Sequence, residues 1–258
     1  MAARAETADA GGFRAESFDG LADVEDASFW FRARNRLIAW AVGAHAPGAR
    51  SLLEVGCGTG YVLAGLRDAF PGLRLTGLEL FEEGLAHARA RLGDEVELIA
   101  ADARDLPYDA AFDVVGAFDV LEHIEEDEAV LAAMVRATRP GGVVLVTVPQ
   151  HAWLWSADDD YACHVRRYSR AELLAKAQRA GLTVEYVTSW VASLLPAMAL
   201  SRLTRRRATE RYDPQGEHRR AERVGALLER VLDAELALVR RHVSLPAGGS
   251  LLLVGRRG

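Results

Sequence analysis

The stretch Glu54-Val55-Gly56-Cys57-Gly58-Thr59-Gly60 decides the fold of this chain. It follows the apolar residues 51–53 and precedes residues 61–70, whose apolar positions recur at helical spacing, so the order reads as strand, glycine turn and helix. Glycines at alternate positions let the backbone turn sharply and let a ligand lie against bare main chain. A dinucleotide-binding turn has the spacing G-x-G-x-x-G, from which this turn departs. We therefore expect a ligand that lies flat across the turn rather than a pyrophosphate.

Apolar runs alternate with helical patterns along most of the chain. Such alternation predicts an α/β fold with a parallel sheet and helices on both faces. The expected strands lie near 51–55, 73–78, 95–99, 112–118, 142–148, 182–188 and 250–254, and the expected helices near 61–70, 82–92, 124–138 and 169–180.

Residues 190–249 separate the last two expected strands and carry apolar residues at helical spacing between Val224 and Val239. A structureless loop of this length would be unusual in a compact domain. We therefore predict a helical insertion between strands 6 and 7. It would act as a lid or substrate wall, or it would only cover the sheet or form a dimer contact.

Further segments follow the glycine turn in a fixed order: L-T-G-L-E-L at 75–80, A-D-A-R-D-L-P at 101–107, a strand ending in D-V-L-E-H-I at 119–124, and R-P-G-G at 139–142. With the turn, they resemble the class I S-adenosylmethionine (SAM) dependent methyltransferases, of the type 11/12-like kind. The resemblance implies a Rossmann-like, seven-stranded, mostly parallel sheet whose last strand is antiparallel. It also implies SAM as cofactor and S-adenosylhomocysteine as product.

The resemblance divides the chain into five parts. These are a flexible tail (1–17), N-terminal cofactor-covering helices (18–50), the SAM-binding α/β core (51–189), the helical insertion (190–249) and the final core strand (250–258).

Glu79 ends the second strand about twenty residues after the glycine turn, where an acidic side chain can bind both ribose hydroxyls. The resemblance implies that Asp102 and Ala103 hold the adenine, and that Phe118 and Asp119 lie beside the methionine half. Acidic side chains would surround a ligand of net positive charge. The cofactor-binding residues expected are Arg34, Glu54, Gly56, Gly58, Gly60, Glu79, Leu80, Asp102, Ala103, Phe118, Asp119 and His123, of which His123 could equally be a packing or capping group.

The aromatic-then-arginine stretch from Phe29 to Ile38 precedes the first strand. Related methyltransferases carry a similar helix over the cofactor, and a guanidinium can bind a carboxylate through two parallel hydrogen bonds. Arg34 is the first candidate for the SAM carboxylate and Arg32 the second. Alternatively, the helix packs its apolar face on the sheet and its arginines are solvated.

Residues 149–169 follow the fifth strand and are dense in groups that bind or transfer protons, and H-x-R-R-Y-S at 164–169 resembles a subset of bacterial small-molecule methyltransferases. His164 is the leading candidate for a general base, followed by His151 and Tyr161. It could instead brace the loop through an aspartate among residues 158–160. The substrate-binding candidates are Trp153, Arg166, Arg167 and Tyr168, although Trp153 could also cap the core.

The chain has 258 residues and a net charge of −6, so it offers no overall basic field to attract nucleic acid. Two cysteines and no apolar leader fit a cytoplasmic protein. The apolar run 191–200 spans about half of the ~20 residues that cross a bilayer. Peripheral membrane contact through Arg202 and Arg205–Arg207 remains an alternative to a solvated face. We expect no metal, because no zinc-ligand spacing occurs, and a monomer or homodimer.

These features predict an enzyme that transfers a methyl group from SAM to O or N of a small molecule, sugar-containing, lipid-linked or a secondary metabolite. A non-catalytic SAM-fold protein that binds a partner through its insertion is the alternative. An NAD-dependent dehydrogenase is disfavoured by the glycine spacing.

Overall fold

The computed structural model describes residues 14–15, 17–205 and 214–258, and the side chains of residues 203–223 are outside that description. The expected tail therefore lies mostly outside the described residues, as do Arg206, Arg207 and the side chain of Arg205.

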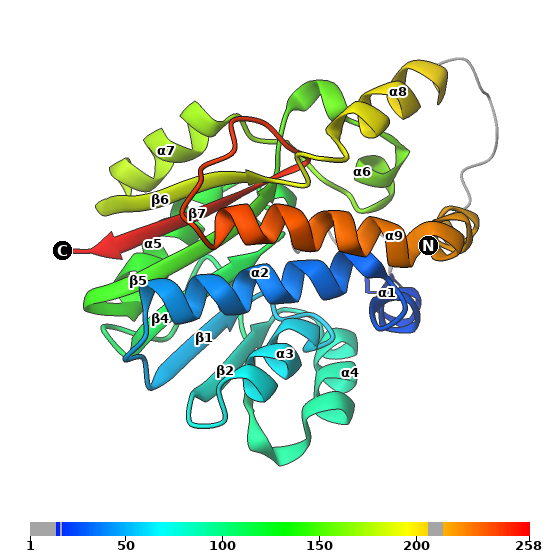
Figure 1. Cartoon of the computed structure of the whole chain (residues 1–258). Helices are drawn as coiled ribbons and strands as arrows, with labels where there is room; N and C mark the ends of the chain where they lie inside the picture. Colours follow the sequence, from blue (N-terminus) through cyan, green and yellow to red (C-terminus); the bar gives the residue numbers. More distant parts are fainter. Residues whose placement is uncertain (1–13, 16, 206–213) are drawn as a thin grey trace.

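Seven strands form one sheet in the order β3-β2-β1-β4-β5-β7-β6 (Figure 1). The first five run parallel, and β7 is antiparallel to both of its neighbours. The predicted fold class is confirmed. The strands are β1 (Ser51–Val55), β2 (Arg74–Glu79), β3 (Glu97–Ala100), β4 (Phe112–Phe118), β5 (Thr138–Pro149), β6 (Leu182–Trp190) and β7 (Ser250–Arg257).

Helices cover both faces of the sheet. One apolar core joins the sheet to α2 (Phe29–His45), α3 (Tyr61–Ala69), α4 (Glu82–Leu92) and α9 (Pro214–Val239). The other joins it to α5 (Asp127–Ala137) and α7 (Arg170–Arg179). The central strand β1 is buried along its whole length, including its polar residues Ser51 and Glu54. The remaining helices are α1 (Ser17–Glu25), α6 (Ala157–Tyr161) and α8 (Leu195–Arg205), with short 3₁₀ turns η1 (Gly93–Glu95), η2 (Leu121–His123) and η3 (Ala152–Leu154).

The expected strands and helices are present, with differences at some of their ends. The helix expected at 124–138 begins at Asp127 and ends at Ala137, because three residues separate η2 from its first turn. The fifth strand begins at Thr138 rather than at 142, since Pro140, Gly141 and Gly142 bulge between its pairings with β4. Both differences concern the first residues of an element rather than its existence or type.

The strand order reverses between β1 and β4, so the chain segments after these two strands diverge and leave a crevice at their carboxyl ends, where ligands of open α/β sheets bind. Helices α8 and α9 lie between β6 and β7 in the chain, and α9 runs alongside α2 (Figure 1). Within the described part of the chain, no helix is both long and apolar enough to cross a membrane.

Candidate active site

A cavity of about 1000 Å³ opens at the carboxyl ends of β1, β2 and β4. Its walls come from the N-terminal helices, the core and the insertion: α1 and α2 contribute aromatic side chains, and α8 and α9 contribute Met198, Gly225 and Glu229. Segments far apart in the sequence therefore enclose one space. Most of the expected cofactor residues line it, namely Arg34, Glu54, Gly56, Gly58, Glu79, Leu80, Asp102, Ala103, Phe118, Asp119 and His123.

The three glycines of the turn have different surroundings, although all have a positive φ. Gly58 faces the cavity, and a Cβ there would meet only Phe18, at 3.7 Å. Gly56 also lines the cavity, but a Cβ would lie 2.6 Å from Val120. Gly60 does not line it, because it packs α3 on α4 and a Cβ would lie 2.8 Å from Leu92. The expectation that Gly60 contacts the ligand is therefore not supported by its position.

Glu79 fastens the glycine turn to the end of β2. Its carboxylate accepts hydrogen bonds from the backbone N–H groups of Gly58 (3.0 Å), Leu80 (2.7 Å) and Phe81 (3.1 Å). Burial raises the pKa of this carboxyl, and the three backbone hydrogen bonds oppose that rise. The side chain is held at the cavity wall with its orientation fixed.

Arg34, on α2, lines the cavity. Its guanidinium is 4.7 Å from the Trp30 ring centre and donates to Asp119 at 2.5 Å. The arginine is 9% exposed, so the burial that the sequence could not reveal is present. Its Nε, like Oε2 of the buried Glu54, has no hydrogen-bond partner among the described residues. Burial raises the pKa of Glu54 well above its usual range, and nearby Arg34 opposes that rise. A buried guanidinium nitrogen and a buried carboxylate oxygen that lack partners suit a ligand that carries both negative and positive groups.

Glu25 belongs to the site, although the sequence analysis did not name it. This buried carboxylate on α1 accepts a hydrogen bond from the Thr59 hydroxyl (2.6 Å) and pairs with Arg91 (3.0 Å). It ties the N-terminal helices to the glycine turn. No local pattern could have identified it, because its partners lie 34 and 66 residues away along the chain.

Asp102 and Ala103 line the cavity where the adenine was expected. The Asp102 carboxylate accepts hydrogen bonds from the guanidinium and the backbone of Arg104, and these bonds lower its pKa. An adenine amine would therefore share this carboxylate with Arg104. Asp105, in the same turn, is almost fully exposed and faces solvent.

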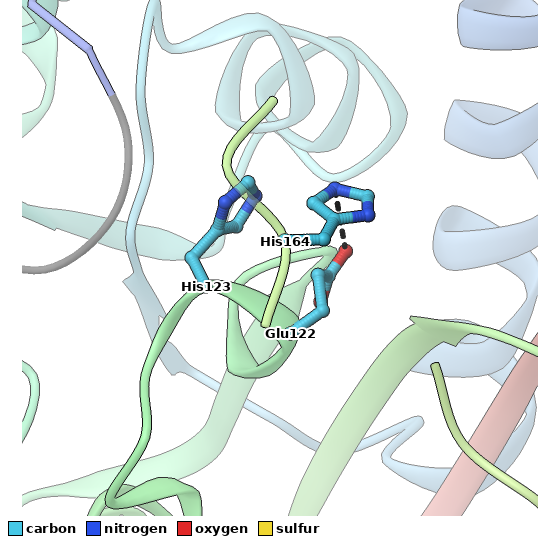
Figure 2. Close-up of side chains that lie close together, drawn as sticks. All are labelled: Glu122, His123 and His164. Atoms are coloured by element: carbon cyan, nitrogen blue, oxygen red, sulfur yellow. Dashed lines mark ion pairs between the residues drawn. The ribbon is translucent and has the colours of Figure 1, made fainter. Parts of the chain in front are cut away.

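Glu122, His123 and His164 meet at the cavity wall (Figure 2). The first two lie on η2, directly after β4, and the third lies on the loop after α6. Burial lowers the pKa of His123 to about 3, with His164 as a second cause, so its imidazole stays uncharged. Burial also raises the pKa of Glu122 well above its usual range. Sequence spacing singled out neither Glu122 nor a metal site, because His123 and His164 lie 41 residues apart along the chain.

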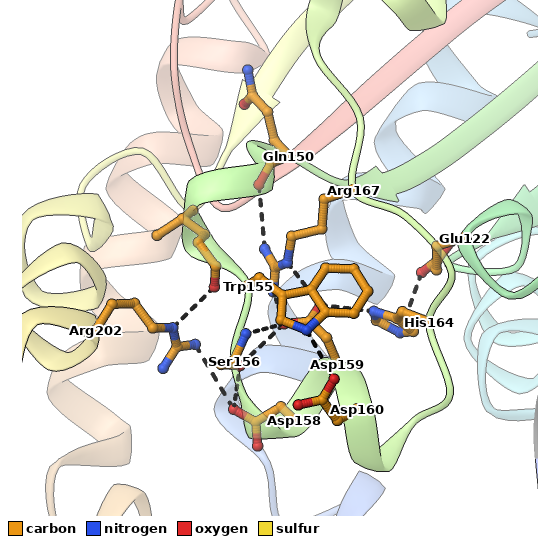
Figure 3. A network of polar contacts seen from close by, with 11 residues as sticks. Glu122, Gln150, Trp155, Ser156, Asp158, Asp159, Asp160, His164, Arg167 and Arg202 are labelled. Carbon is orange, nitrogen blue, oxygen red and sulfur yellow. Dashed lines mark hydrogen bonds and ion pairs between the residues drawn. The ribbon is translucent and has the colours of Figure 1, made fainter. Parts of the chain in front are cut away.

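Asp159 organises the loop around His164 (Figure 3). It is fully buried and lies 2.8 Å from Nδ1 of His164, and it also accepts hydrogen bonds from Arg167 at 2.7 and 3.0 Å. Burial raises its pKa, but these hydrogen bonds outweigh that effect and the net shift is downward. An ionised Asp159 can only accept, so His164 donates from Nδ1 and its Nε2 lone pair is available. The predicted contact between His164 and an aspartate of this loop is therefore present, and His164, Arg167 and Tyr161 all line the cavity.

Four other predicted residues do not line the cavity: His151, Trp153, Arg166 and Tyr168. Tyr168 is fully buried, because its pairing with Gln150 turns it into the core, where its hydroxyl donates to Asp127 at 2.6 Å.

Arg166 pairs with Glu125 and Asp127, and Trp153 is 52% exposed and stacks on His151. None of the four lines the cavity, so their positions do not support the substrate or base roles predicted for them.

Ion pairs fasten the insertion over the cavity. On α2, Arg32 pairs with Glu229 at 2.6 Å and Arg36 pairs with Asp233 at 2.8 Å, both partners lying on α9. Arg202 donates to the Leu154 carbonyl at 3.0 Å and lies near Asp158. Arg32 is thus engaged with the insertion, which leaves Arg34 as the candidate for a ligand carboxylate.

Residues 53–146 match the family model "Methyltransferase domain". A "probable S-adenosylmethionine-dependent methyltransferase" of Mycolicibacterium smegmatis is 34% identical over 64% of this chain and 63% of its own length. A "ubiquinone biosynthesis O-methyltransferase" of Thiobacillus denitrificans is 31% identical over 54% of this chain and 67% of its own.

The SAM-bound amino pentose methyltransferase CalS10 of Micromonospora echinaspora superposes with a TM-score of 0.50 and 27% identity, covering 62% of this chain and 90% of that one. The chain spans less than two thirds of the Mycolicibacterium relative. With the observed strand order and the glycine turn, these matches show that the chain belongs to the class I SAM-dependent methyltransferases.

Proposed function

We propose that this protein transfers a methyl group from SAM to an oxygen or nitrogen atom of a small molecule. The observation that carries the proposal is the shared cavity. The glycine turn, Glu79 and the orphaned carboxylate of Glu54 line one part of it, and the Asp159–His164 pair lines another.

SAM supplies an electrophilic methyl group on a sulfonium. Glu79 would accept hydrogen bonds from the ribose hydroxyls, and Asp102 with Ala103 would hold the adenine. Arg34 would bind the ligand carboxylate, while Glu54 and Asp119 would face its cationic groups. The orphaned atoms of Arg34 and Glu54 fit this ligand, because each could gain the partner it lacks in the described protein.

His164 would accept the proton that an oxygen or nitrogen acceptor loses. Asp159 fixes its tautomer and leaves Nε2 free to accept a proton. Such a base contributes roughly 10²–10⁴-fold, whereas alignment of the reacting atoms contributes about 7–11 kcal/mol. Positioning by the cavity walls would therefore dominate the rate.

The acceptor would be a small molecule with an apolar portion. Aromatic residues of α1 and α2 line the cavity together with Met198, and drug-sized ligands occupy cavities of about 300–1000 Å³. Of the relatives described above, one is named a ubiquinone biosynthesis O-methyltransferase and another an amino pentose methyltransferase. An aromatic hydroxyl or a sugar amine or hydroxyl is thus the first class to test.

Transfer of a labelled methyl group from SAM to panels of phenols, amino sugars and lipid-linked sugars tests the proposal. His164→Asn should lower kcat while SAM affinity is retained, and the surface variant His87→Gln should match the wild type. SAM binding without transfer to any acceptor would instead favour a non-catalytic binding protein.

A further inference from the structure

Two imidazoles and a carboxylate converge at the cavity wall in a way that a single general base does not require. The candidate ligand atoms of Glu122, His123 and His164 all lie within 4.8 Å of one another (Figure 2). Glu122 Oε1 is 4.0 Å from Nε2 of His164, and the two imidazole rings are 4.7 Å apart at 80°. The three side chains line the same cavity, so a group bound among them would be accessible to a substrate.

The carboxylate of Glu122 is the second observation that points to a bound cation. It is 1% exposed, and its Oε2 has no hydrogen-bond partner among the described residues. A buried, unsatisfied carboxylate oxygen is destabilising unless it is paired or coordinates a metal. The other carboxylate oxygen, Oε1, lies 4.0 Å from Nε2 of His164, beyond hydrogen-bond length.

The orientation of His164 matches that of a metal ligand. Its Nδ1 donates to the buried Asp159, which is itself held by Arg167. A carboxylate behind an imidazole fixes the tautomer and raises the basicity of the other nitrogen, which is the usual outer support of a metal-bound histidine. His123 supplies the second imidazole of the cluster, from the same 3₁₀ turn as Glu122.

We propose that Glu122, His123 and His164 bind one divalent transition-metal ion, with zinc, cobalt or manganese as the chemical class. Two imidazoles and one carboxylate are a ligand set for such ions, and the remaining coordination positions would face the cavity. Ligand atoms on a tetrahedral ion with bonds of about 2.1 Å lie about 3.4 Å apart, so the three side chains would draw together by roughly 1 Å. That adjustment is within reach of side-chain rotation.

The site would hold an acceptor through an oxygen atom, a consequence that rests on the proposed methyl transfer. In that case His164 is a metal ligand rather than a base, and acceptors with hydroxyl groups are favoured over amines. Metal binding itself does not depend on the proposed reaction. The two proposals can therefore fail separately.

Calorimetric titration of the full-length protein, stripped with a chelator, with Zn²⁺, Co²⁺ or Mn²⁺ tests the site directly. We expect one ion per chain for the wild type, and a Co²⁺ absorption band typical of nitrogen ligands. Glu122→Gln and His123→Asn should each weaken binding by about 100-fold or more, beyond the 10–100-fold loss typical of an outer-shell partner. His87→Gln, on α4 and outside the cavity lining, is the matched control and should bind like the wild type.

Absence of saturable binding of all three ions to the wild type would overturn the proposal, as would equal affinity in the ligand variants. If Glu122→Gln does not fold, Asp159→Asn replaces it, because it keeps all three ligands and should weaken binding by about 10–100-fold. Metal binding without methyl transfer to any acceptor would leave the site standing and reject the proposed function. Methyl transfer by a metal-free protein that binds none of the ions would support the proposed function and reject the metal site.

Discussion

Glu79 holds the glycine turn against the end of β2, and from the same position it can accept a hydrogen bond from a ligand. Three backbone N–H groups fix the carboxylate against the glycine turn: Oε1 accepts two of them, whereas Oε2 accepts one and retains acceptor capacity. Hydrogen bonds to charged groups contribute about 1.5–3 kcal/mol each. A ligand hydroxyl would thus gain from a carboxylate that needs no reorientation on binding.

We expect Glu79→Gln to weaken SAM binding by about 10- to 150-fold, the equivalent of one such charged hydrogen bond. Titration calorimetry measures this affinity. Glu83→Gln, on the exposed side of α4, is the control and should leave it unchanged. An unchanged affinity in Glu79→Gln would reject the ribose role of this residue.

The buried carboxyl of Glu54 makes SAM affinity depend on pH. Burial raises its pKa well above the ordinary 4.5, so the carboxyl is protonated over a pH range in which an exposed glutamate would be ionised. A cationic ligand favours the ionised form, so SAM affinity should rise as pH increases above about 4.5 through the raised pKa. Without ligand the sign is opposite: the folded state binds the extra proton, so the stability contributed by this group falls over the same window.

Calorimetry from pH 5 to 7 in buffers of different ionisation enthalpy should detect proton release on SAM binding by the wild type. Glu54→Gln should flatten the pH dependence, because it cannot ionise. A variant with the same slope as the wild type would show that another group is responsible.

At the scale of single elements, Gly60 is a packing position between α3 and α4. Gly60→Ala should destabilise the fold by about 1–3 kcal/mol, because φ is +75° and the added Cβ would lie 2.8 Å from Leu92 and 3.2 Å from Ala88. Thermal unfolding measures the loss. Gly72→Ala, whose Cβ would meet nothing within 4 Å, is the control and should change stability by less than about 0.5 kcal/mol.

The ion pairs between α2 and α9 hold the insertion against the cofactor-covering helix. Glu229→Arg would bring a third guanidinium group against those of Arg32 and Arg36, so α9 should loosen around residue 229. Amide hydrogen exchange should become faster in residues 224–239. Combining it with Arg32→Glu should restore protection. Failure of this double variant to recover would indicate that apolar packing, not charge, holds α9 in place.

Local patterns predicted most helices and strands, because the residues that determine each element are neighbours in the sequence. The strand expected at 51–55, the glycine turn and the helix after it are examples, and each is present. The contacts that complete the site are not local. Glu25 meets Thr59, and Glu122 meets His164, only after the chain has folded. Tyr168 shows the same dependence on contacts that are distant in the sequence. Its sequence neighbours are polar, yet it is buried in the core.

At the scale of the whole molecule, three parts of the chain enclose one cavity: the N-terminal helices, the core and the insertion. A ligand bound there contacts all three and binds only to the folded state. Its binding free energy therefore adds to the stability of the whole chain rather than to that of one element.

SAM at 100 times its Kd should stabilise the protein by about 2.7 kcal/mol, and so raise Tm by about 5–11 °C for a chain of this size. NAD at the same concentration should produce no shift, because the glycine turn lacks the spacing of a pyrophosphate site and Gly60 is occupied with helix packing. Differential scanning fluorimetry distinguishes the two. A larger shift with NAD than with SAM would contradict the assignment of the cavity, whereas equal shifts from SAM in the wild type and Glu79→Gln would place the cofactor elsewhere.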